Sequence, residues 1–172
     1  MATPNWVLTL VYWLHMLATV VWIGSLTSLS ILVLPAARQI LDSQDYASLL
    51  GKIQKRLDPL AWFSLLLLLA TGMVQLAASP NYKGFLAVDD RWAVAILIKH
   101  VLFVMLILLS AYMTWVLLPT LRREALKSTL QATDSQTETN TVTLQQREVF
   151  ILRINLLLGV IILALTAIAR TS

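Results

Sequence analysis

Long runs of apolar residues, separated by polar stretches, dominate the chain. Four runs stand out, and they cover about residues 6–34, 60–78, 92–118 and 149–169. A helix rises about 1.5 Å per residue and needs about 20 residues to cross the hydrocarbon core, so each run is long enough to span a bilayer. Backbone polar groups find no water in lipid, and spanning segments therefore fold as helices. The pattern predicts an all-α membrane protein with four transmembrane helices in a bundle.

The polar stretches between the runs differ in character. Residues 36–58 combine basic side chains with apolar residues at helical spacing, which is typical of a short amphipathic helix in the membrane interface. Residues 79–91 are rich in turn-forming residues. Residues 124–147 are rich in Thr, Gln and Ser, which predicts a mobile polar loop. No internal repeat is evident, and we expect a single membrane domain over residues 1–172.

The distribution of basic residues predicts the orientation. The first and third connections together hold eight of them, namely Arg38, Lys52, Lys55, Arg56, Arg122, Arg123, Lys127 and Arg147. The opposite side holds three, namely Lys83, Arg91 and Arg170. Because basic loops stay in the cytoplasm, both connections are expected to be cytoplasmic and both termini outside. The expected location is a bacterial inner membrane.

Composition agrees with a membrane domain and excludes several classes of protein. Of the 172 residues, 58% are hydrophobic and 13% are charged, too few charges for a water-soluble surface. The net charge of +4 comes from short basic clusters beside apolar runs, which argues against nucleic-acid binding. The chain has no cysteine, so disulfides and thiolate metal sites are excluded. The N-terminus has no pattern of a cleavable signal peptide.

Few ionisable residues lie inside the apolar runs, and none of them is acidic. They are His15, Lys99, His100 and Arg153. A charged residue at mid-membrane costs about 2.5–3.5 kcal/mol on insertion scales, so each needs a reason to be there. The lack of carboxylates argues against a carboxylate-based proton or cation relay. Arg153 lies near the cytoplasmic end of its run, where its side chain is expected to reach the headgroups.

The two histidines lie at matching predicted depths. With both termini outside, runs 6–34 and 92–118 cross the membrane in the same direction. His15 and His100 then lie about 13 and 12 Å from the outer ends of their helices. Two imidazoles at one level on two helices fit the axial ligation of a haem b iron. The alternative is that each histidine only hydrogen-bonds a neighbouring helix.

Further residues near this level are candidates for binding. Gly72 lies about 9–10 Å below the outer end of its run, where a glycine lets a flat macrocycle approach the backbone. Lys99 either reaches the outer headgroups or pairs with an anionic group such as a haem propionate, a quinone oxygen or a tetrapyrrole carboxylate. Arg91 is the alternative partner for a propionate. Met16 and Met73 lie near the histidines and are candidate soft ligands for copper.

Several short motifs resemble one family of membrane proteins. "LHMLATVVWIG" (residues 14–24) resembles the first helix of the copper-resistance protein D (CopD) family and of the related HemJ-type protoporphyrinogen oxidases. Further matches are "QKRLDPLAWF" (54–63), "ATGM" (70–73) and the spacing from Trp92 to Lys99. The likeness covers about residues 8–121 and implies a four-helix membrane domain.

The resemblance carries functional expectations. In HemJ-like proteins the residues matched by His15 and Lys99 are tied to haem or tetrapyrrole binding, whereas CopD-like proteins are implied to move copper across the membrane. His100 and the long third loop depart from the HemJ pattern. His100 adds a second potential axial ligand.

The leading functional hypothesis is therefore a membrane-embedded b-type haem protein, with His15 and His100 as ligands, that transfers electrons to or from a quinone or a periplasmic carrier. The second hypothesis is copper transport or resistance, and the third is a protoporphyrinogen oxidase with Lys99 binding substrate. A fourth is an accessory subunit of a larger respiratory or photosynthetic membrane complex, or of a homo-oligomer.

Overall fold

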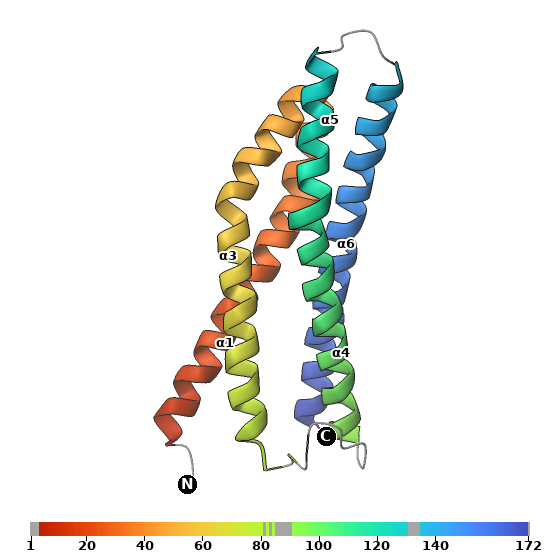
Figure 1. The fold of residues 1–172 in the computed structure, drawn as a ribbon. Coiled ribbons are helices and arrows are strands. Elements are labelled where there is room, and N and C mark those ends of the chain that lie inside the picture. Colours follow the sequence, from red (N-terminus) through yellow and green to blue (C-terminus); the bar gives the residue numbers. More distant parts are fainter. Residues whose placement is uncertain (1–3, 81, 83, 85–90, 131–134, 172) are drawn as a thin grey trace.

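Helices account for nearly all of the chain in the computed structural model, which describes residues 4–80, 82, 84, 91–130 and 135–171 (Figure 1). The first rod consists of α1 (Asn5–Thr27), the π-helical turn η1 (Ser28–Val33) and α2 (Leu34–Ile40). The second is α3 (Ser43–Ala77). The third consists of α4 (Arg91–Tyr112), the π-helical turn η2 (Met113–Leu117) and α5 (Leu118–Leu130), and the fourth is α6 (Ser135–Thr171).

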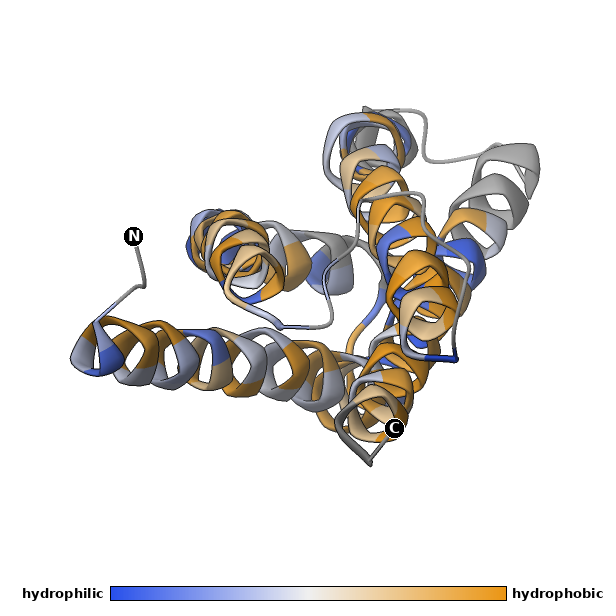
Figure 2. Ribbon diagram, turned by 90° about the horizontal axis from the view of Figure 1, so that it is seen from below, coloured by the Kyte–Doolittle hydropathy of each residue, from blue (hydrophilic) through white to orange (hydrophobic). Residues whose placement is uncertain are grey.

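Each of the four rods contains a segment that is long and apolar enough to cross a membrane. Within the described residues these segments are Asn5–Ile40, Ser48–Ala77, Arg91–Glu124 and Thr143–Ala169. Figure 2 shows apolar residues on outward as well as inward faces of the helices, as expected for a surface that meets lipid. The predicted all-α bundle of four transmembrane helices is confirmed, and the chain is a multi-pass membrane protein.

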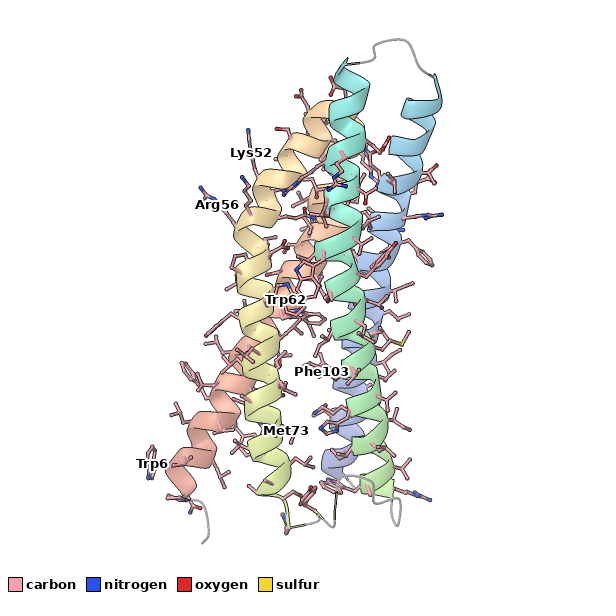
Figure 3. The ribbon with its side chains drawn as sticks, in the orientation of Figure 1. Trp6, Lys52, Arg56, Trp62, Met73 and Phe103 are labelled. Carbon is pink, nitrogen blue, oxygen red and sulfur yellow. The ribbon has the colours of Figure 1, made fainter. Side chains whose placement is uncertain are left out.

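The two ends of the bundle differ chemically. Lys52 and Arg56 lie on α3 at one end, which we call the basic end (Figure 3). Trp6 and both ends of the chain lie at the opposite end, which we call the terminal end (Figures 1 and 3). The basic end corresponds to the side that the sequence assigns to the cytoplasm.

The rods pack as two antiparallel pairs. The helix α1 packs along α3, and α4 packs along α6. The pairs meet through the contact between α5 and α3 and through a smaller contact between α1 and α6. Near the middle, Trp22, Leu65, Leu106 and Leu158 bring one buried side chain from each rod into a common core. The two pairs are thus joined at the middle and at the basic end.

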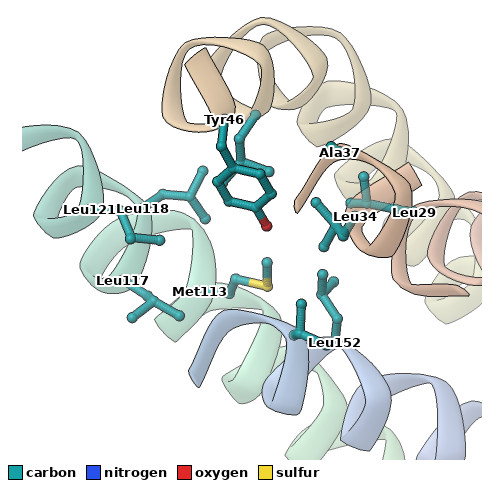
Figure 4. Close-up of a cluster of buried hydrophobic side chains, with 11 residues drawn as sticks. Leu29, Leu34, Ala37, Tyr46, Met113, Leu117, Leu118, Leu121 and Leu152 are labelled. Atoms are coloured by element: carbon teal, nitrogen blue, oxygen red, sulfur yellow. The ribbon is translucent and has the colours of Figure 1, made fainter. Parts of the chain in front are cut away.

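A larger core fills the basic end (Figure 4). It is a cluster of buried side chains from all four rods, namely Leu29, Leu34, Ala37, Tyr46, Leu50, Met113, Leu117, Leu118, Leu121, Val149 and Leu152. In Figure 4 the Tyr46 ring points from α3 into the centre of this cluster. A tyrosine so placed needs a partner for its hydroxyl group.

The connections depart from the sequence predictions. The separate interfacial helix predicted within residues 36–58 is not confirmed, because Ser43 begins the same continuous helix α3 that spans the membrane and contains Pro59. Most of the predicted loop 124–147 is helical, since α5 continues to Leu130 and α6 begins at Ser135. The remainder of that loop, residues 131–134, lies outside the described residues. So does most of the turn-rich connection 79–91.

Two prolines lie inside helical rods rather than ending them. The π-helical turns end just before Pro35 and Pro119. A proline lacks an N–H and crowds the preceding turn, and a wider π turn relieves both problems locally. The Leu34 N–H accordingly bonds the Leu29 carbonyl, and the Leu118 N–H bonds the Met113 carbonyl, each five residues back. Each rod therefore continues past its proline.

An internal correspondence that the apolar pattern does not reveal follows these turns. The first and third rods both read Leu-Pro-x-x-Arg directly after the π turn. Arg38 and Arg122 occupy the same position in the two motifs. Each arginine reaches the backbone of another rod, Arg38 the carbonyl of Gln145 on α6 and Arg122 the carbonyl of Gly51 on α3. At the basic end, each helix pair thus donates one arginine hydrogen bond to the backbone of the other pair.

Candidate functional site

His15 lies on α1, half-buried against α3 in the terminal-end half. Its Nδ1 lies 2.7 Å from the Thr71 hydroxyl oxygen. Thr71 directs its own hydroxyl hydrogen to the Leu67 carbonyl at 2.5 Å, so its oxygen accepts a hydrogen bond from His15 Nδ1–H. In the neutral ring the lone pair then lies on Nε2. This bond to α3 is the hydrogen bond to a neighbouring helix that the sequence offered as the alternative to metal ligation. Metal-binding histidines also have their second ring nitrogen held by an oxygen of the protein, so metal binding by His15 remains a prediction.

Gly72 lies directly beside this imidazole. A Cβ atom at Gly72 would meet His15 Cε1 at 3.5 Å, an ordinary van der Waals distance. The structure therefore places the His15 ring against the backbone at Gly72. Binding of a macrocycle at this glycine remains a prediction. The role of Thr71, the residue just before Gly72, as the partner of His15 was not predicted from the sequence.

His100 lies on α4 and is also half-buried. Its Nδ1 lies 2.7 Å from the Ile96 carbonyl oxygen of the preceding turn. A carbonyl only accepts, so Nδ1 carries the hydrogen and Nε2 carries the lone pair of the neutral ring. Both histidines thus share one tautomer, with Nδ1–H donated to an oxygen. Convergence of the two rings on one metal remains a prediction.

Lys99 is half-buried on α4 and lies within electrostatic reach of His15. The structure thus brings a cation from the second helix pair toward the histidine of the first. Arg91, the other predicted partner for an anionic group, is exposed at the start of α4. Arg153 is exposed on α6, as expected for a side chain that reaches the headgroups.

The methionines are not enclosed with the histidines. Met16 is 66% exposed and Met73 is 46% exposed. Neither is therefore held in a closed ligand set. Within the described residues, moreover, no group of three or more His, Asp or Glu side chains is arranged to hold a metal ion. His15 and His100 remain candidate ligands for a metal ion that imidazole suits, such as copper or iron.

A second polar group lies buried at the basic end and was missed in the sequence. Glu148 on α6 is fully buried beside Tyr46 and Gln145, and Arg38 lies next to them. Glu148 borders the fourth apolar run, so hydropathy alone assigns it to a polar loop. The signal that could have revealed it is its position seven residues before the buried Asn155, on the same face of α6.

The comparisons with known proteins place the chain in a family. No curated protein and no solved structure is significantly similar to it. The family model of copper resistance protein D matches residues 51–169, which run from within α3 to near the end of α6 and leave out α1 with His15. The resemblance to protoporphyrinogen oxidases is not confirmed by these comparisons. A match over more than half of the chain, on a four-helix membrane fold, shows that the chain belongs to the copper resistance protein D (CopD) family.

Proposed function

We propose that this protein handles copper at the membrane and binds Cu(I) in the terminal-end half of the bundle, with Nε2 of His15 as a ligand. The hydrogen bond from His15 Nδ1 to Thr71 is the observation that carries the proposal. It fixes the tautomer that leaves Nε2 as the lone-pair nitrogen and orients the ring. Membership in the CopD family supports copper as the metal.

His100 is the second ligand that we propose. Its ring is fixed in the same tautomer by the Ile96 carbonyl, and imidazole nitrogens are suitable ligands for copper ions. With both termini outside, the two rings lie on the outer side of the bilayer midplane. Copper would then reach them from the outer face.

Copper binding to the purified protein tests the proposal. The full chain in detergent micelles is titrated with Cu(I) against a chromophoric chelator, and X-ray absorption reports the ligand atoms. We expect one high-affinity Cu(I) with nitrogen neighbours, lost in His15→Ala and in His100→Ala. Met16→Leu and Met73→Leu are the matched controls and should keep the site. Equal affinity in His15→Ala and the native protein would refute the proposal.

Thr71 offers a finer prediction. The variant Thr71→Val keeps the shape of the side chain but removes the oxygen that accepts from His15 Nδ1. We expect copper affinity to fall by about 10–100-fold, the usual effect of removing such a supporting hydrogen bond. Thr166→Val is the control, because the bond that the Thr166 hydroxyl makes among the described residues is to the Ile162 carbonyl of its own helix. Unchanged affinity in Thr71→Val would show that the hydrogen bond does not serve the metal.

A b-type haem is the second candidate, favoured by one observation. Both histidines have Nδ1 hydrogen-bonded to an oxygen, which suits axial imidazole ligands as well as copper ligands. Lys99 is then the proposed partner for a propionate. A reduced-minus-oxidised absorption spectrum separates the candidates, because a haem protein gives a sharp α band and a Cu(I) protein is colourless.

A further inference from the structure

Glu148 is a carboxyl group enclosed entirely by protein. It lies on α6 at the basic end, and its exposed fraction is 0%. One oxygen, Oε2, accepts a long hydrogen bond from the Tyr46 hydroxyl at 3.4 Å. The other oxygen, Oε1, has no hydrogen-bond partner among the described residues. Burying a carboxylate with an unpaired oxygen costs free energy, so a proton or another ligand bound at this oxygen would stabilise the folded protein.

The charged neighbour of Glu148 is Arg38, on α2. Its guanidinium group donates to the Gln145 carbonyl, and its Cζ lies 5.4 Å from the centre of the Tyr46 ring. Among the described residues, Tyr46 on α3 is another titratable group that faces the carboxyl group. Met113 and Leu117 of η2 belong to the apolar core around Tyr46, whereas the charged Arg122 of α5 lines a cavity with Tyr46. Arg38 thus supplies the positive charge that balances an ionised Glu148.

A small cavity lies between α3 and α5 at the basic end, and Tyr46 is part of its lining. Its volume is about 10 Å³, which is roughly the space that one water molecule needs. It is lined by Tyr46, Leu50, Gly51, Gln54, Leu118, Leu121 and Arg122. The side chain of Arg122 is exposed, whereas Gln54 is buried and its Oε1 has no partner among the described residues. Gln54 can therefore accept a hydrogen bond from a water molecule in this cavity.

Tyr46 has the chemistry of a proton relay. Burial and, secondarily, the negative charge of Glu148 raise the pKa of Tyr46 to about 12. The phenol therefore keeps its hydrogen at physiological pH, and a hydroxyl group both donates and accepts. The Tyr46 hydroxyl donates to Glu148 Oε2, and Tyr46 also lines the cavity.

We propose that Glu148 is a proton-binding site filled from the basic end, with Tyr46 as the relay. A hydronium ion in the cavity gives a proton to the Tyr46 oxygen as the Tyr46 hydrogen moves to Glu148 Oε2. The carboxylate becomes a carboxylic acid, Tyr46 is again a phenol, and one water molecule remains in the cavity. The groups along this route present oxygen atoms, which bind a proton readily but are poor ligands for Cu(I). The site is separate from the histidines, and its test does not depend on copper binding.

Infrared difference spectroscopy of the full chain in lipid nanodiscs tests the site. Acidification of the native protein should produce the carbonyl-stretch band of a buried carboxylic acid. The band should be absent from Glu148→Gln and displaced in Glu148→Asp, whose shorter side chain changes the hydrogen bond to Tyr46. The control Asp45→Asn, which removes an exposed carboxylate near the start of α3, should leave the band in place. A band that persists unchanged in both Glu148 variants, or a native protein without the band, would overturn the proposal.

The role of Tyr46 has its own readout. After a rapid drop in pH, Tyr46→Phe should still form the Glu148 band, but about tenfold or more slowly, because the relay hydroxyl is lost. A purely structural role for Tyr46 predicts the native rate of band formation. That result would remove Tyr46 from the route and overturn the proposed relay.

Discussion

Replacing Arg38 with methionine is expected to lower the free energy of unfolding by about 3 kcal/mol, because Glu148 is then buried without a compensating charge. Methionine keeps most of the length of the side chain, so the lost group is the guanidinium and its bond to the Gln145 carbonyl. Titration with a denaturing detergent, followed by tryptophan fluorescence, measures the change. The control Arg153→Met removes an exposed arginine on α6 and should change stability by less than about 1 kcal/mol.

A double variant separates charge from packing in this effect. If the cost comes from an uncompensated carboxylate, Arg38→Met combined with Glu148→Gln should recover most of the lost stability. Coupled neighbours deviate from additivity in this way by about 0.5–3 kcal/mol. Strictly additive losses from the two substitutions would contradict the pairing of Arg38 with Glu148.

Adding a methyl group at Gly159 is expected to destabilise the protein by about 1–3 kcal/mol through overpacking. This glycine on α6 allows the first and fourth rods to approach closely. A Cβ atom there would lie 3.0 Å from Cζ3 of Trp22, which is 4% exposed and held within the middle core. The Trp22 side chain must then shift by a few tenths of an ångström, which disturbs its packing in the middle core. A lower apparent melting temperature of Gly159→Ala in micelles would report the loss.

The matched control for this prediction is Gly24→Ala. A Cβ atom at Gly24 meets nothing within 4 Å, although this residue also lies inside a membrane-spanning helix. Alanine is the better helix former by about 1 kcal/mol, so this variant should be as stable as the native protein or more stable. If both alanine variants behaved alike, contact with Trp22 would not be the reason for the glycine at 159.

Hydropathy predicts the number and approximate centres of the helices because lipid leaves the backbone no other choice. It fails at the helix ends. Pro35 and Pro119 look like terminators, yet π-helical turns let both rods continue. The polar residues around Leu130 look like a loop, yet α5 and α6 extend beyond the apolar runs and still pack on each other. Side-chain polarity reports where the membrane ends, which is not where the helix ends.

The candidate sites show a similar division. Residue type and predicted depth make His15 and His100 candidate ligands from the sequence alone. The hydrogen-bond partner of His15 is harder to predict from the sequence, because Thr71 is distant in the chain and threonines are common in membrane helices. Glu148 is harder still, since its burial depends on Arg38 and Tyr46, which precede it by about a hundred residues. Contacts between distant segments arise only when the rods pack.

The π-helical turns also set the angular phase of the helices. Each holds about one residue more than an α-helical turn, and one residue corresponds to about 100° around the axis. Deletion of a single residue within Ser28–Val33 would let η1 close into regular helix without breaking the rod. Among related chains, insertions and deletions of one residue should therefore concentrate at η1 and η2. Such a change at η1 would rotate the helix face that carries His15 by about a quarter turn relative to Arg38, and a change at η2 would do the same for Lys99 relative to Arg122.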